Sequence, residues 1–145
     1  MAEDSPFTVD ADWLEQRLGQ PGLSVVDVSW YLPAQKRDAR AEYEAAHIPG
    51  AVFLDQDDIS DPDSPLPHTL ASPRHFAQYV GARGISADDT IVVYDGPGFF
   101  SAPRAWWMFR IMGVFQVFIL EGGLDGWKAA GRRVTNEQTR IAPCV

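Results

Sequence analysis

Cysteine is nearly absent from the chain, since its 145 residues include only Cys144, next to the last residue. One cysteine excludes an internal disulfide and a zinc site built from cysteines. No run of about 18 apolar residues is present to span a bilayer. The acidic segment from Met1 to Pro6 precedes no apolar run of the kind found in secretory signals. These absences predict a protein of a reducing compartment, which we expect to be the cytoplasm.

Positive charge is also scarce, with 12 Lys and Arg against 20 Asp and Glu and a net charge of −8. Because nucleic acids and anionic membranes are bound through clustered Lys and Arg, we expect neither as a partner. His47, His68 and His75 have no metal-ligand spacing, so we expect no metal site. The 46% of apolar residues and the five Trp are sufficient for a core. The length suits one domain of roughly 100–200 residues.

Helix and strand signals alternate along the chain. Short apolar runs predict buried strands at 23–28, within 48–54, at 90–94 and at 117–120. Capping residues and glycines predict helices after Asp10, at 38–46, from 73 to about 82, from Ser101 to 112 and at 124–130. This order is typical of βαβ units, so the predicted fold is α/β, with a parallel sheet covered by helices on both faces. Ligands of such sheets bind past the carboxyl ends of the strands.

The loop after the strand at 90–94 is the main candidate for such a site, and it reads D-G-P-G-F-F-S from Asp95 to Ser101. It lacks the glycine and lysine spacing of phosphate-binding loops. It also lacks the partners of a phospho-accepting aspartate, because Asp27 lies inside a strand and no lysine follows Leu120. A covalent nucleophile on this loop would favour cysteine. We therefore favour a structural interpretation, in which the Asp95 side chain accepts hydrogen bonds from following N–H groups and fixes the turn.

Three ordered segments resemble the motifs of rhodanese-like domains. Residues 42–51 read E-Y-E-A-A-H-I-P-G-A, residues 91–95 match the strand that leads into the active-site loop of that family, and residues 120–127 read L-E-G-G-L-D-G-W. The resemblance extends over nearly the whole chain. It implies a single rhodanese-like domain over residues 1–134, with residues 135–145 as the start of an interdomain linker.

Segments 57–70 and 100–110 are similar to the first half of two-domain 3-mercaptopyruvate and thiosulfate sulfurtransferases. In that family the first domain lacks the catalytic cysteine, and the second domain carries it as a persulfide-forming nucleophile. Asp95 stands where the cysteine would be. The resemblance implies an enzyme that moves sulfur from 3-mercaptopyruvate or thiosulfate to a thiol or cyanide. It implies a second rhodanese domain in the same chain as partner, no cofactor, and a piece that is inactive alone.

The same resemblance implies supporting catalytic roles for Asp57 and His68, in the acidic, proline-rich segment 55–68. A carboxylate that orients an imidazole sets its tautomer and raises its pKa. The structural alternative is that Asp57 caps the turn at Ile59 and that His68 is a surface histidine. The alternative for the whole chain is a free-standing, catalytically inactive rhodanese-like module that binds a partner protein. Cys144, in a polar tail, is expected to be an inert thiol.

Trp106 and Trp107 lie about 100° apart on one predicted helix, so one buried stripe cannot hold both. We expect one of them to pack on the sheet. The other is then available to pack against a partner domain.

Overall fold

The computed structural model describes residues 7–20, 22–31, 38–55, 73–85, 89–96, 101–114 and 116–136. Its strands are β1 (Thr8–Val9), β2 (Leu23–Asp27), β3 (Val52–Phe53), β4 (Thr90–Tyr94) and β5 (Val117–Leu120). Its helices are α1 (Ala11–Glu15), α2 (Ala39–Ala45), α3 (Pro73–Ala82), α4 (Ala102–Ile111) and α5 (Gly123–Ala129).

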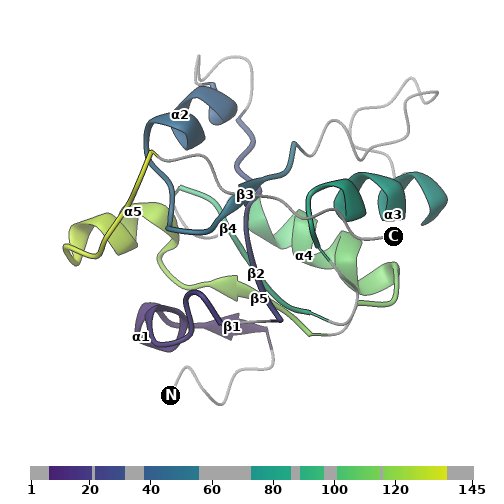
Figure 1. Cartoon of the computed structure of the whole chain (residues 1–145), viewed down its shortest axis with the longest axis horizontal. Helices are drawn as coiled ribbons and strands as arrows, with labels where there is room; N and C mark the ends of the chain where they lie inside the picture. The colour runs from purple at the N-terminus through teal and green to yellow at the C-terminus, as the bar shows by residue number, and fades with distance from the viewer. Residues whose placement is uncertain are drawn as a thin grey trace.

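The strands form one parallel sheet in the order β1-β5-β4-β2-β3, with β4 in the centre (Figure 1). The predicted α/β fold is therefore confirmed. The edge strand β1 was not predicted, because its two residues are too few to show a period.

Side chains alternate between the two faces of the sheet, as period-2 strands require. On β4, Ile91 and Val93 join a core with α3 and α4, whereas Val92 and Tyr94 join a second core with α1 and α5. Figure 1 shows the two sets of helices on opposite sides of the strands. Because both faces are covered, β4 is buried and its sequence reads as a continuous apolar run.

Two of the helices begin at capping aspartates, of which Asp10 was predicted as a cap and Asp38 as the first residue of a helix. The Asp10 carboxylate accepts the N–H of Trp13 at 2.8 Å, and the Asp38 carboxylate accepts the N–H of Ala41 at 3.1 Å. Each bond satisfies a donor that the first helical turn leaves unpaired. No helix in the described part of the chain has the length and apolar character needed to cross a bilayer.

Parallel pairing brings the carboxyl ends of the strands to one edge of the sheet. Asp27, the last residue of β2, is in register with Phe53 of β3 on one side and with Tyr94 of β4 on the other. Asp95 follows Tyr94 directly. Two aspartates from segments far apart in the chain therefore lie at the ends of neighbouring strands.

Candidate functional site

Asp95 is fully buried at the end of β4 and caps helix α4. Its Oδ2 atom accepts the backbone N–H groups of Ser101 at 2.7 Å and of Ala102 at 2.9 Å. The carboxylate thus lies at the positive end of the helix dipole and satisfies two donors. These contacts confirm the structural interpretation of Asp95.

Ser101 occupies the N-cap position of α4, but the prediction that its side chain caps the helix is wrong. Its Oγ donates to the carbonyl oxygen of Val28 at 3.1 Å and accepts the N–H of Trp30 at 3.1 Å. Ser101 therefore ties the segment after β2 to the start of α4. Sequence pattern cannot show this, because the bonds span more than 70 residues.

Asp27 is 2% exposed and accepts the backbone N–H of Ser29 at 2.9 Å. Burial raises the pKa of its carboxyl from 3.8 to about 6, and the charge of Asp95 adds to the rise. Hydrogen bonds from Ser29 and the charge of His47 act in the opposite direction. A carboxyl group with this pKa can hold or release a proton near neutral pH. The local pattern placed Asp27 inside a strand and did not predict its raised pKa, although an acid at the end of an apolar run was a signal that could have indicated it.

His47 is 1% exposed and holds the turn before β3. Its Nδ1 lies 2.8 Å from the carbonyl oxygen of Tyr43, and the two rings stack at 4.2 Å. Its backbone pairs with Thr135 through bonds of 2.9 and 2.8 Å. The histidine therefore joins α2, the turn and the last described residues.

Two cavities open at the carboxyl edge of the sheet. One of about 190 Å³ is lined by Asp27, Gly96 and Lys128, among others. The second, of about 330 Å³, lies between the ends of β2 and β3 and the start of α2.

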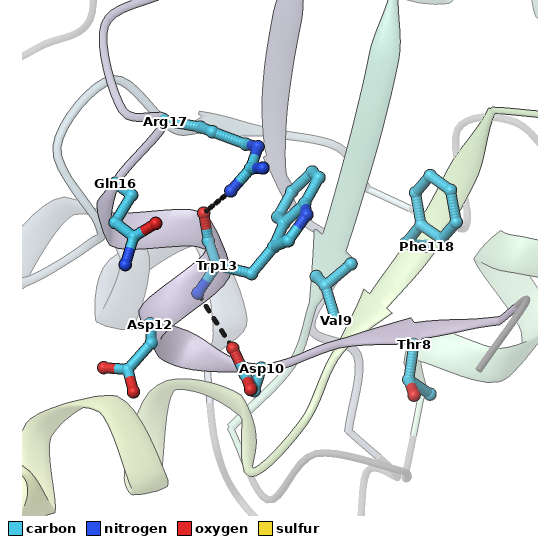
Figure 2. Close-up of a pocket in the computed structure, with 8 residues that line it drawn as sticks. All are labelled: Thr8, Val9, Asp10, Asp12, Trp13, Gln16, Arg17 and Phe118. Carbon is cyan, nitrogen blue, oxygen red and sulfur yellow. Dashed lines mark hydrogen bonds between the residues drawn. The ribbon is translucent and has the colours of Figure 1, made fainter. Parts of the chain in front are cut away.

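A third cavity, of about 530 Å³, lies along the edge strand β1 at the other side of the sheet. Figure 2 shows Trp13 and Phe118 in its wall, with the guanidinium of Arg17 turned back to the Trp13 carbonyl oxygen. That cavity lies at the opposite edge of the sheet from β3.

The tryptophan pair divides as predicted. Trp106 is half-buried, and its Nε1 donates to the Val117 carbonyl oxygen at 3.0 Å. Trp107 is 44% exposed.

Asp57, His68 and Cys144 lie outside the described residues, so their roles stay predictions. Among the residues that the structure describes, no group of three or more His, Cys, Asp or Glu side chains is arranged to hold a metal ion.

Comparison with known proteins agrees with this fold. Residues 10–130 match the family model of the rhodanese-like domain. The chain belongs to the rhodanese-like domain family. It is 46% identical over 143 residues to thiosulfate sulfurtransferase of Cricetulus griseus, covering 94% of this chain and 48% of the relative. It is 49% identical over 123 residues to thiosulfate/3-mercaptopyruvate sulfurtransferase 1, mitochondrial, of Arabidopsis thaliana, covering 85% and 32%.

A solved structure is similar at the level of the whole backbone. The crystal structure of SseA, a 3-mercaptopyruvate sulfotransferase of Escherichia coli, matches with a TM-score of 0.88 and 40% identity, over 97% of this chain and 55% of that one. The chain thus spans a third to about half of the length of these relatives.

Proposed function

We propose that this chain is the first half of a two-domain sulfurtransferase, and that its own loop after β4 carries no nucleophile. The observation that carries the proposal is the Asp95 carboxylate, which occupies the N–H groups at the start of α4. The partial coverage of the sulfurtransferase relatives supports the need for a second rhodanese domain. A soluble enzyme of the cytoplasm remains our expectation, although one relative is named for the mitochondrion.

The proposed reaction has two transfers. A cysteine thiolate of the second domain attacks the thiol sulfur of 3-mercaptopyruvate or the outer sulfur of thiosulfate. Attack on 3-mercaptopyruvate breaks its C–S bond and, after protonation, leaves pyruvate; attack on thiosulfate breaks its S–S bond and leaves sulfite. The outer persulfide sulfur then passes to cyanide or to a thiol, and the cysteine thiolate is regenerated.

Asp57 and His68 have supporting roles in this proposal. Asp57 would orient the imidazole of His68, which exchanges a proton with the donor or acceptor. Asp57 follows β3 by four residues, and β3 ends at the edge of the sheet that holds Asp27 and Asp95. That connection supports a place for the pair beside the carboxyl edge.

A partner-binding module is the second candidate function. Trp107 and Ile111 are each 44% exposed and lie four residues apart on α4, so they share one face of the helix. An apolar surface of this kind suits contact with another protein, including the second domain itself.

The experiment compares the present chain with the longer two-domain protein, using each donor with cyanide. We expect turnover only in the longer protein. There, His68→Ala should lower turnover by about 10²–10⁴-fold, the usual contribution of a positioned acid or base. His75→Ala, on α3, is the matched histidine control and should leave turnover unchanged.

Unchanged turnover in the His68→Ala and Asp57→Ala proteins would contradict the roles assigned to these residues. Turnover by the present chain that Cys144→Ser abolishes would contradict the absence of a nucleophile. A longer protein without turnover on either donor would favour the partner-binding module.

A further inference from the structure

Arg40, near the start of α2, carries a guanidinium group that is held in place but has no ionic partner in the described part of the chain. The guanidinium carbon lies 5.1 Å from the centre of the Phe53 ring, and no hydrogen bond or ion pair engages the group there. Arg132 differs, because it pairs with Asp12 and Glu15 at 2.6 and 2.9 Å. Stacking on an aromatic ring positions a guanidinium while leaving its N–H donors available.

This guanidinium lines the cavity of about 330 Å³ at the carboxyl edge. Trp30 and Phe53 supply aromatic walls, and Ser29 supplies a polar group at the end of β2. Apolar walls with few polar groups are typical of sites for small molecules. Cavities past the carboxyl ends of parallel strands are the usual ligand sites of open α/β sheets.

Two acids, Asp38 and Asp55, also line the cavity. The Asp38 carboxylate accepts the N–H of Ala41, so it is held at the cap of α2 rather than paired with Arg40. The negative charges of both acids weaken the attraction of an anion to Arg40. Any anion bound here is therefore bound weakly, and removal of one acid strengthens its binding.

We propose that this cavity binds the anionic group of the sulfur donor through Arg40. The ligand class is a small carboxylate or thiosulfate, whose paired oxygens match the fork of the guanidinium. The assignment rests on the proposed function, because it takes the donor from there. It adds a residue that determines donor affinity, on the domain that lacks the nucleophile.

The first test uses the present chain alone. Sodium pyruvate and sodium thiosulfate are titrated separately, in NMR experiments that follow the Arg40 Nε–H and the Trp30 indole N–H at constant ionic strength. We expect saturable shifts for both anions, with dissociation constants of order millimolar, and their loss in Arg40→Gln. Asp38→Asn keeps a capping side chain and removes one charge, so it should tighten binding about two- to fivefold.

The matched control is Arg17→Gln. Arg17 also lies over an aromatic ring, 4.2 Å from the centre of Trp13, and lines the cavity at the β1 edge. Its guanidinium already donates to the Trp13 carbonyl oxygen, as Figure 2 shows. We expect Arg17→Gln to bind both anions like the wild type. Shifts that persist in Arg40→Gln, or that Arg17→Gln abolishes, would overturn the proposal.

The second test uses the longer two-domain protein. Arg40→Gln should raise the KM for 3-mercaptopyruvate about tenfold or more and leave its kcat nearly unchanged, because the carboxylate that Arg40 contacts does not react. With thiosulfate the KM should rise as well and kcat should also fall, because the group that Arg40 contacts leaves as sulfite. Arg40→Lys should recover part of the loss. An active enzyme with an unchanged KM in Arg40→Gln would overturn the inference but leave the proposed function intact. A wild-type protein without turnover would contradict the proposed function, and the titrations would still decide whether the cavity binds anions.

Discussion

Asp27 and Asp95 end neighbouring strands and are both buried, but their surroundings differ. Asp95 accepts two backbone N–H groups at the start of a ten-residue helix. Asp27 accepts the backbone N–H of Ser29 and faces the charge of Asp95, and its pKa rises to about 6. Burial alone therefore does not decide whether a carboxylate has a structural role or holds a proton. The donors that the backbone presents to it, and the charge next to it, decide whether it is a structural anchor or a proton-holding group.

Asp95 also matters for the nucleophile that the loop after β4 lacks. The N–H groups that begin α4 can stabilise an anion, and in this chain the Asp95 side chain takes that place. The N–H groups of Ser101 and Ala102 are therefore already engaged by a side chain of the protein itself.

The largest effect should come from Asp95→Ala. The substitution leaves two N–H groups in a buried position without their carboxylate, and each lost charge-assisted bond costs about 1.5–3 kcal/mol. We expect the free energy of unfolding to fall by about 3–5 kcal/mol, measured by urea denaturation.

Asp95→Asn serves as the conservative variant. Its amide oxygen still accepts hydrogen bonds from the same N–H groups but carries no charge. We therefore expect the free energy of unfolding to fall by about 1 kcal/mol. Equal losses in the two variants would show that the charge, rather than the acceptor, maintains the start of α4.

Asp27→Asn should change the free energy of unfolding in the opposite direction and stabilise the protein near neutral pH. The pKa of Asp27 is about 6 in the folded protein against an ordinary value of 3.8, so the folded state binds this proton more tightly than the unfolded state. Its contribution to stability is therefore full below about pH 4, falls as the pH rises to about 6, and stays lost above that pH. The shift corresponds to about 3 kcal/mol.

We expect Asp27→Asn to be more stable than the wild type at pH 7.5, by up to about 3 kcal/mol, and the gain to vanish near pH 4. Urea denaturation of both proteins from pH 4 to pH 8 measures this difference. A gain that is independent of pH, or a variant that is less stable at pH 7.5, would contradict the raised pKa.

Ser101→Ala is expected to change the free energy of unfolding less than Asp95→Ala or Asp27→Asn. The hydroxyl links Val28 and Trp30 to the start of α4, and its loss removes two neutral hydrogen bonds. We expect the free energy of unfolding, measured by urea denaturation, to fall by about 1–2 kcal/mol. Because Asp95 rather than Ser101 caps the helix, the helicity of α4 should be retained, as judged by backbone chemical shifts. Loss of the first turn of α4 in this variant would contradict that division of roles.

Local pattern predicted most of the elements. The run at 90–94 matches β4 at both ends, and Asp10 caps α1 as expected. The strand β1 was missed because it pairs only through β5, more than 100 residues away. Ser101 was taken as a cap because local spacing favours it, but the Asp95 carboxylate accepts the N–H groups of Ser101 and Ala102 instead.

Local periodicity and motifs were enough to predict the parallel α/β fold, the family and the absence of a cysteine from the loop after β4. The raised pKa of the buried Asp27, the capping of α4 by Asp95 and the position of Arg40 over Phe53 in a cavity follow only from the folded structure. The physical reason is that burial, electrostatic coupling and cavity shape depend on residues that parallel strand pairing brings together from distant parts of the chain.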